Sequence, residues 1–222
     1  MRIVQVGVGS WGRDWHAHVL RKHDAVEIAG LVDADAVALR HAATEFNVDE
    51  RLCFESLERA LGAVESDAVL ITATLPAHAP ACRAALESGA HVLCEKPFTE
   101  TGDEALELAE LAASRGRVLM VSQNYRHFPA MRWLSRAVGD RRYGDLASVS
   151  IDFRQYANGP SNTNRRYLES WHPLLVDMAI HHMDLLRLVV ADEPIDVSCS
   201  AQNPTWSRFR DPPTAVATVT FP

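Results

Sequence analysis

The feature that most constrains the fold is an alternation of short apolar runs with helical stretches over the first 123 of the 222 residues. Six runs have the length and β-branched content of buried strands, and a helical stretch follows each of the first five. Strands that are apolar throughout are typical of a parallel sheet covered by helices on both faces. We therefore predict a doubly wound α/β domain of the Rossmann type over residues 1–123. The expected strands are 2–6, 26–32, 52–54, 68–72, 91–95 and 117–123.

Residues 124–222 follow a different pattern and predict a second, α+β domain with an open, mainly antiparallel sheet. A sheet of three strands leaves an edge and much of one face uncovered. We therefore expect this domain to be truncated, with further strands or a partner chain completing it. The expected helices are 128–138 and 173–190, and the expected strands are 146–156, 195–202 and 214–221.

Charge and composition exclude several classes of protein. The formal net charge of −7 and the lack of a basic cluster argue against a nucleic-acid-binding protein. No apolar run is long enough to span a bilayer, and the chain starts without a signal-peptide pattern. Four cysteines without CxxC spacing indicate reduced thiols, neither a zinc site nor a disulfide framework. We expect a cytoplasmic protein.

A GxGxxG motif stands between the first expected strand and the first expected helix. Its glycines are Gly7, Gly9 and Gly12, and Ser10 and Trp11 open the helix. The first glycine permits a tight turn, the second lets backbone approach a pyrophosphate, and the third allows close helix–strand packing. The amino end of the helix favours an anion. A glycine turn without a ligand is the alternative, but this context favours a nicotinamide dinucleotide site.

Asp33 ends the second expected strand, where a carboxylate accepts hydrogen bonds from the adenosine ribose hydroxyls. Asp35 lies nearby, and no arginine or lysine follows closely. Two carboxylates in this position would repel a 2′-phosphate. The sequence therefore favours NAD over NADP.

Glu95, Lys96 and Pro97 end the fifth expected strand, on the edge where open α/β sheets bind ligands. Lys96 would hydrogen-bond a substrate oxygen and stabilise negative charge that develops on it. Taken alone, the three residues fit a surface salt bridge and turn equally well. His78 follows the fourth expected strand on the same edge, and there it either begins a helix or lines the site.

Asp177 and His181 lie four residues apart in the expected helix 173–190 and so share one face. A histidine with a carboxylate one turn earlier is suited to act as a general base. A surface pair is one alternative, and a metal site made from His181, His182 and Asp184 is another. Adjacent histidines diverge on a helix, so we predict no metal site.

Four further side chains are candidates for contact with a substrate. Tyr125 and Arg126 follow the sixth expected strand, where Arg126 would reach substrate oxygens or pair across the domain junction. Trp171 and His172 precede the histidine helix and would line a pocket, although aromatic residues in such a place are as often part of a core.

Together the motifs resemble those of the Gfo/Idh/MocA family, named for glucose–fructose oxidoreductase, inositol dehydrogenase and a rhizopine-catabolism protein. The resemblance runs along essentially the whole chain, and its most specific part is the block that joins His78 to the Glu95-Lys96-Pro97 triplet. It rests on VGVGSWG, HAPACRAALESGAHVLCEKP, VSQNYRHFPAMRWL and LLVDMAIHHMDLL.

This resemblance implies roles for the candidate residues. In the family the lysine of the EKP triplet lies beside nicotinamide and substrate, which places Lys96 there. The D-x-x-x-H element of the family falls on Asp177 and His181, with His181 as the proton-transfer residue. The implied cofactor-binding residues are Gly7, Gly9, Ser10, Trp11, Gly12, Asp33, Thr74, His78, Glu95 and Lys96.

The implied activity is NAD-dependent hydride transfer to or from a secondary alcohol of a sugar, cyclitol or related polyol. A homodimer or homotetramer would form through the sheet of the second domain. Two rival functions are a dinucleotide-binding regulatory or scaffold subunit without catalysis, and a dehydratase or glycosidase that uses bound NAD transiently.

The chain departs from the family pattern in three places. Ala73-Thr74 replaces the usual threonine–proline pair, and residues 171–174 replace a glycine-rich lead into the histidine helix. The second change predicts a differently shaped pocket. Family chains also usually extend further, which is the basis for expecting a truncated second domain.

Overall fold

A computed structural model of the chain describes residues 1–156, 168–169 and 172–222. These residues form two compact units, Met1–Ser122 and Gln123–Pro222. Within the described residues, no helix is long and apolar enough to cross a membrane.

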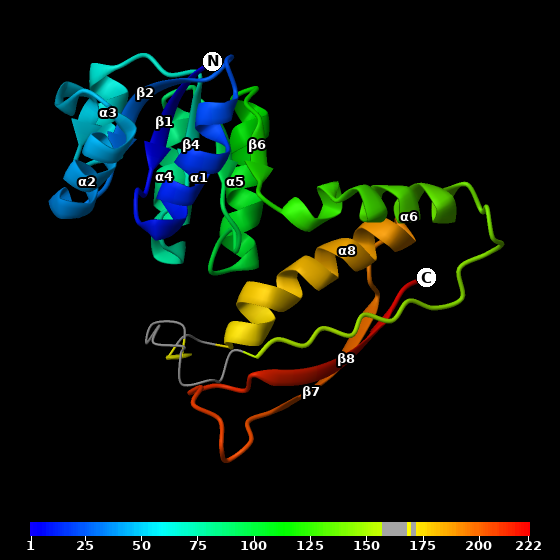
Figure 1. Ribbon diagram of the computed structural model, residues 1–222. Helices are drawn as coiled ribbons and strands as arrows, with labels where there is room; N and C mark the ends of the chain where they lie inside the picture. The colour runs from blue at the N-terminus through cyan, green and yellow to red at the C-terminus, as the bar shows by residue number, and fades with distance from the viewer. Residues whose placement is uncertain (157–167, 170–171) are drawn as a thin grey trace. The chain divides into compact units, whose positions relative to one another are not determined.

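The first unit is built on a six-stranded parallel sheet with the order β3-β2-β1-β4-β5-β6 (Figure 1). Successive crossovers run in one direction from β1 to β3 and in the other from β4 to β6. The reversal between β1 and β4 is the switch point at which doubly wound sheets bind ligands. The predicted fold class is confirmed. The strands are β1 (Arg2–Val6), β2 (Glu27–Val32), β3 (Cys53–Phe54), β4 (Ala68–Ile71), β5 (His91–Cys94) and β6 (Leu119–Val121).

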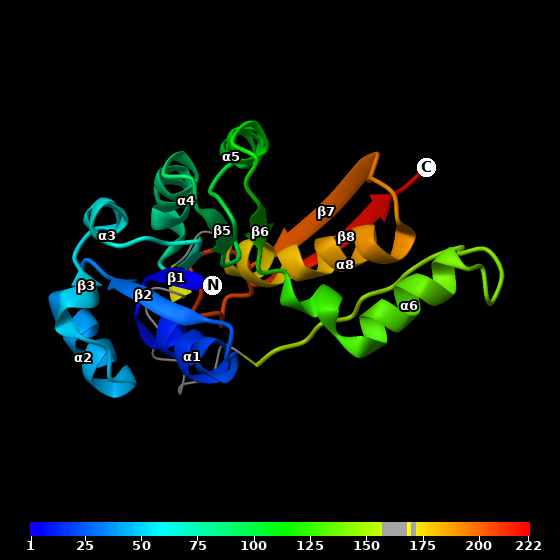
Figure 2. The same cartoon turned by 90° about the horizontal axis from the view of Figure 1, so that it is seen from above.

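Helices cover both faces of this sheet, with α1 and α2 on one face and α3, α4 and α5 on the other (Figure 2). Asp35, Ser56 and Thr101 cap α2, α3 and α5 by accepting backbone N–H groups of the first turn. The α-helices are α1 (Ser10–His18), α2 (Ala36–Phe46), α3 (Leu57–Ala63), α4 (His78–Glu87) and α5 (Gly102–Ser114). Short 3-10 turns are η1 (Leu20–Lys22), η2 (Glu50–Leu52) and η3 (Leu75–Ala77).

The core of the first unit consists of apolar clusters on both faces of the sheet. Val69 and Ile71 pack with Leu108 and other residues of α3, α4 and α5, whereas Leu31 packs with Leu39 of α2. All are buried. Truncation of a buried leucine to alanine in such a core typically costs about 2–5 kcal/mol. This packing fixes the strand ends that carry the candidate site.

The second unit combines two helices with a two-stranded antiparallel sheet. Helix α6 packs along α8, and the β7–β8 hairpin completes the unit (Figure 1). Its elements are η4 (Asn124–His127), α6 (Pro129–Gly139), the π-helix η5 (Leu174–Ala179), α8 (Ile180–Val190), β7 (Asp196–Gln202) and β8 (Thr214–Thr220).

One expectation for the second unit is wrong. A strand is expected at residues 146–156, but they join no ladder among the described strands. Their alternating pattern specifies an extended chain with two different faces, but it cannot specify a partner edge. The expected helix 173–190 is present, with a π-helix at Leu174–Ala179 and an α-helix from Ile180 onward.

Candidate dinucleotide and catalytic site

Two glycines of the motif are required by the fold itself. Gly7 has a φ of +87°, a conformation that favours glycine, and its N–H donates to the Val32 carbonyl at 2.8 Å. A Cβ atom on Gly7 would also overlap the backbone of Ala73, and one on Gly12 would overlap the carbonyl oxygen of Gly7. The tight turn and the close helix–strand contact predicted from the sequence are therefore both present.

Gly9 differs, because among the described residues no atom other than those of its chain neighbours and its own helix backbone lies within 4 Å of the place where its Cβ would be. Packing of the described residues therefore gives no reason for a glycine there, whereas close approach of a ligand to the backbone does. Gly9 is the N-cap of α1, and Ser10 and Trp11 follow it on the surface. The first turn of α1 contains no acidic residue. This amino end suits the pyrophosphate of a dinucleotide.

Asp33 is held at the end of β2 by backbone donors. Its Oδ2 accepts the Val8 N–H at 2.8 Å, and its Oδ1 accepts the Asp35 N–H at 2.9 Å. A carboxylate oxygen can accept more than one hydrogen bond, so both oxygens keep capacity for ribose hydroxyls. Asp35 caps α2 and adds a second negative charge to this edge. The arrangement fits NAD.

A buried polar network, which the sequence prediction missed, supports the glycine turn through a hydrogen bond to its backbone. Gln5 is fully buried in β1 and donates from Nε2 to the Gly12 carbonyl at 2.7 Å. Its Oε1 lies 3.1 Å from Nδ1 of His16, whose ring stacks on Phe46 at 3.8 Å. Burial lowers the pKa of His16 to about 4. One sequence signal could have revealed this network, namely the glutamine Gln5 inside an otherwise largely apolar strand.

Glu95, predicted as a cofactor contact, is 5% exposed, and its Oε1 accepts the Trp15 indole N–H at 2.7 Å. Its Oε2 lies 3.1 Å from the backbone N of Lys96, which donates to it. Glu95 therefore ties helix α1 to the end of β5 and braces the loop that carries Lys96. Its contact with the cofactor stays a prediction.

Lys96 is half-buried at the carboxyl end of β5, on the ligand-binding edge predicted for it. The chain contains 20 arginines but only two lysines, Lys22 and Lys96. A lysine ammonium is a compact point charge, and its pKa shifts more readily in a buried site than that of a guanidinium. Thr74 lies exposed in the loop after β4, where the sequence placed it as a cofactor contact.

His78 is also more deeply placed than the sequence indicated. Its side chain is 1% exposed at the start of α4. Nδ1 lies 2.8 Å from the Pro97 carbonyl oxygen, and Nε2 lies 3.0 Å from that of Ala73. Both ring nitrogens therefore face the protein. The predicted contact of His78 with the cofactor stays a prediction.

In the second unit, His181 and Tyr125 form a stacked pair. The ring centroids are 4.1 Å apart with an interplanar angle of 10°, and His181 is 4% exposed. Arg126, the next residue along η4, forms an ion pair with Asp184, with Nε and Oδ2 3.4 Å apart. The structure thus brings Tyr125 and Arg126 together with the histidine helix. Asp177 lies in the π-helix that precedes His181.

The remaining candidates of the second unit are dispersed. The His182 ring packs against Phe153 at 5.1 Å, and burial lowers the pKa of His182. The His172 N–H donates to Asp211 Oδ2 at 3.1 Å, which ties it to the segment before β8. Trp171 lies outside the described residues. No group of three metal-ligating side chains occurs among the described residues.

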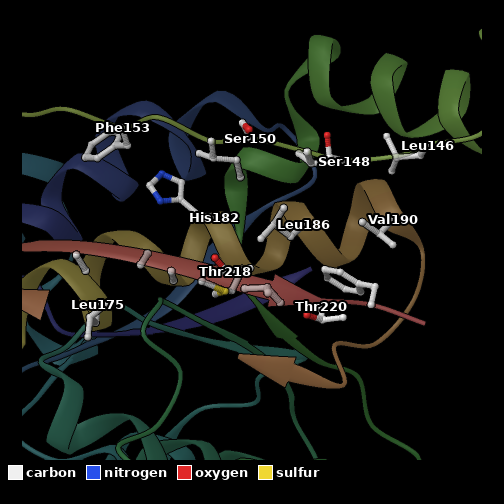
Figure 3. Close-up of a pocket in the computed structure, with 18 of the residues that line it drawn as sticks. Leu146, Ser148, Ser150, Phe153, Leu175, His182, Leu186, Val190, Thr218 and Thr220 are labelled. Atoms are coloured by element: carbon white, nitrogen blue, oxygen red, sulfur yellow. The ribbon is translucent and has the colours of Figure 1, made fainter. Parts of the chain in front are cut away.

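A groove of about 700 Å³ runs along α8 in the second unit, and no sequence pattern indicated it. Residues 146–153 form one wall and β8 forms another. Figure 3 shows His182, Leu186 and Val190 projecting into it from α8.

The fold and the glycine turn define a dinucleotide-binding oxidoreductase scaffold, and comparison with known proteins assigns the family. Residues 1–123 match the model of the oxidoreductase family with an NAD-binding Rossmann fold, and residues 131–222 match the Gfo/Idh/MocA C-terminal domain. The chain belongs to the Gfo/Idh/MocA family, as the motifs predicted.

Named relatives include two sugar dehydrogenases. A D-apiose dehydrogenase of Paraburkholderia graminis is 32% identical over 84% of this chain and 49% of its own length. A UDP-N-acetylglucosamine 3-dehydrogenase of Acidithiobacillus ferrooxidans is 31% identical over 89% of this chain and 56% of its own. The chain therefore spans about half the length of these relatives.

Solved structures share the fold. The scyllo-inositol dehydrogenase of Lactobacillus casei, solved with NAD(H) and scyllo-inositol, superposes with a TM-score of 0.86 at 22% identity. The match covers 100% of this chain and 66% of that one.

Proposed function

We propose that this chain is the dinucleotide-binding and catalytic part of an NAD-dependent oxidoreductase acting on a secondary alcohol of a sugar, cyclitol or related polyol. The observation that carries the proposal is the placement of Lys96. It lies on the ligand-binding edge of the sheet, in a loop braced by Glu95, while the glycine turn occupies the switch point of the same sheet. The names of the relatives support the substrate class.

The glycine turn, the amino end of α1 and Asp33 would hold NAD. Backbone at Gly9, Ser10 and Trp11 would face the pyrophosphate, and Asp33 would bind the ribose, with Thr74 contributing from the next loop. The carboxylates of Asp33 and Asp35 disfavour the extra phosphate of NADP. Bound NAD would supply the nicotinamide C4 that accepts the hydride.

Lys96 would hold and polarise the substrate oxygen, and His181 would take its proton in the oxidative direction. Positioned donors of this kind typically contribute about 3–4 kcal/mol of transition-state stabilisation each. Asp177 would orient the histidine or the substrate.

Tyr125 would assist His181 once the histidine carries the substrate proton. A cation stacked over an aromatic ring is stabilised by about 0.5–2 kcal/mol, and the two rings are already stacked. Arg126 would donate from its guanidinium to substrate oxygens while it keeps its ion pair with Asp184. His172 and Trp171 are proposed to line the substrate pocket, and no metal is proposed.

We also propose a division of labour between residues 1–123, which bind NAD, and residues 124–222, which bind substrate and assemble the oligomer. The exposed β7–β8 sheet supports a homodimer or homotetramer formed through this domain. The four free cysteines support a cytoplasmic location. The named relatives are dehydrogenases and reductases, which makes a scaffold subunit or a transient-NAD dehydratase or glycosidase the weaker proposal.

Calorimetric titration of the purified chain with NAD and with NADP tests the cofactor proposal first. NAD is expected to bind saturably and NADP more weakly, and Asp33→Ala is expected to weaken NAD binding by roughly tenfold through loss of a charge-assisted hydrogen bond. Ser114→Ala, far along α5, is the matched control and should change nothing.

A screen of sugars and cyclitols for nicotinamide reduction then tests the activity. Net reduction with any member supports the dehydrogenase. Turnover of substrate without net reduction would replace it with the dehydratase or glycosidase. Binding of NAD without turnover of any substrate would leave the scaffold subunit, and a folded chain that binds neither cofactor would contradict the whole proposal.

A further inference from the structure

His78 is surrounded by backbone carbonyl oxygens on both sides of its ring. Nδ1 lies 2.8 Å from the oxygen of Pro97 and 3.3 Å from that of Phe98, and Nε2 lies 3.0 Å from that of Ala73. The first two oxygens belong to the loop after β5, and the third belongs to the loop after β4. One buried ring therefore bridges two loops of the ligand-binding edge.

The bridge connects the glycine turn with the lysine loop. The backbone of Ala73 packs so closely on Gly7 that a Cβ on Gly7 would overlap it. Thr72, just before Ala73, donates from its hydroxyl to the Gly7 carbonyl at 2.6 Å. At the other end, Pro97 follows Lys96 directly. The contacts thus run from the dinucleotide turn through His78 to the residue beside Lys96.

The chemistry of the contacts explains why the ring holds the two loops. A carbonyl oxygen only accepts and the imidazole supplies the N–H, so the ring donates a hydrogen bond to a loop carbonyl. His78 is 1% exposed, so water does not compete for this contact. A hydrogen bond in such a buried place is electrostatically stronger than one in water.

We infer that His78 is a positioning residue, a buried clamp that holds the Lys96 loop against the glycine turn. The inference rests on the proposed function in that Lys96 is the residue positioned. Its backbone geometry also stands independently of that function, because the two loops would be joined whether or not a substrate binds.

Nitrogen-15 NMR of the full chain labelled at histidine tests the hydrogen bond of the ring directly, without any turnover. The ring N–H of His78 is expected to exchange slowly with water, because it is buried and donates to a loop carbonyl. His41, which is exposed, provides the rapidly exchanging reference. Spectra of His78→Gln and His41→Gln assign the two signals. A His78 ring N–H that exchanges as rapidly as that of His41 would overturn the clamp.

The two lysines allow a second readout of loop position. Reductive methylation with a carbon-13 label gives signals for Lys22, for Lys96 and for the amino terminus, and Lys22→Arg and Lys96→Arg assign the two lysine signals. His78→Gln is expected to move the Lys96 signal and leave that of Lys22 in place. The matched control is His91→Gln at the start of β5, where His91 Nδ1 accepts the Val118 N–H at 2.9 Å. It should move neither signal, and an unmoved Lys96 signal in His78→Gln would contradict the inference.

Kinetics complete the test if the chain turns over. Misplacement of a reacting group by about 1 Å typically lowers a rate by up to 100-fold, so His78→Gln is expected to lower kcat by roughly 10- to 100-fold with NAD affinity within about threefold. An unchanged kcat would overturn the positioning role. If the wild-type chain shows no turnover, the proposed function fails, and the two NMR experiments still decide whether the clamp exists.

Discussion

The two units of this chain hold their candidate catalytic groups by different means. In the first, Lys96 lies on a loop anchored by ladder hydrogen bonds, by the Glu95 carboxylate and by the His78 ring. In the second, His181 rests on one helix, stacked on Tyr125, beside a hairpin whose strands are largely exposed. In a parallel sheet, the loops that follow the strands all lie at the carboxyl edge, so one loop can brace another. The hairpin of the second unit provides no such edge.

The helix ends show the same difference. Three helices of the first unit have side-chain caps, and α5 has a full capping box between Thr101 and Glu104. Neither α6 nor α8 has a side-chain cap among the described contacts. We expect substitutions of the bracing residues of the first unit, such as Glu95, to act on stability and site geometry together.

The largest expected effect is that of Lys96→Ala. Loss of the group that holds the reacting oxygen should lower turnover by roughly 1,000-fold or more, with NAD affinity little changed because the glycine turn is intact. Steady-state kinetics and calorimetric titration measure the two quantities. Lys22→Ala is the matched control, since Lys22 is the other lysine of the chain and is exposed. Equal loss of turnover and NAD affinity in Lys96→Ala would show that Lys96 is not the catalytic lysine.

The glycines of the motif should separate folding from binding. Gly12→Ala forces a Cβ against the Gly7 carbonyl and is expected to destabilise the chain by about 1–3 kcal/mol, the usual cost of overpacking. Gly9→Ala meets no protein atom, so it should leave stability nearly unchanged and weaken NAD binding. Chemical unfolding and titration measure both. Gly62→Ala in α3, where the space is also open, should stabilise by roughly 0.5–1 kcal/mol. Loss of stability in Gly9→Ala would show that the fold also requires a glycine at position 9, against the distinction drawn between Gly9 and Gly12.

Acid should destabilise the first unit through His16. The folded pKa of about 4 lies below the ordinary value of 6.5, so the unfolded chain binds the proton more readily. The stabilisation is complete above pH 6.5 and is lost as pH falls toward 4, by up to about 3 kcal/mol. Unfolding free energies across this range should fall less steeply in His16→Gln. His182→Gln should flatten the profile less, because His182 is only partly buried. Parallel profiles for wild type and His16→Gln would refute the assignment.

The smallest expected effect is that of the α5 cap. Thr101→Ala removes the acceptor of the Glu104 N–H and should cost about 1 kcal/mol, measured by chemical unfolding. Thr44→Ala, which removes a hydroxyl bonded to the Arg40 carbonyl within α2, should be nearly neutral and serves as the control. A Thr101→Ala variant as stable as wild type would show that the box contributes little to the first unit.

The first unit was largely predictable because its signals are local. Each signal is read from neighbouring residues: apolar runs predict strands, the glycine motif predicts the turn, and an acidic residue at a strand end predicts a ribose contact. The strand order follows from the rules for parallel sheets. The roles of Glu95 and His78 were not predictable, because each depends on a partner in another segment of the chain, Trp15 for Glu95 and Pro97 for His78. Whether a carboxylate at a strand end faces a ligand or a neighbouring helix depends on packing.

The second unit was predicted less well for a related reason. The alternation in residues 146–156 describes two faces of an extended segment, yet a strand exists only with a partner. The π-helix at Leu174–Ala179 leaves no mark in the apolar spacing. The stacking of Tyr125 on His181 joins two segments that lie more than fifty residues apart. The sequence named both residues without indicating that they touch.

The fold requires two of the three motif glycines but not the third, and this difference affects what their presence in related sequences would mean. Gly7 and Gly12 are held in place by the fold, so a descendant that had abandoned nucleotides would keep them in order to stay folded. Packing does not require a glycine at position 9, so without selection for a ligand this position would be substituted early. Among descendants of this chain, survival of the first and third glycines reports only a preserved architecture. Survival of the second reports continued selection for the ligand.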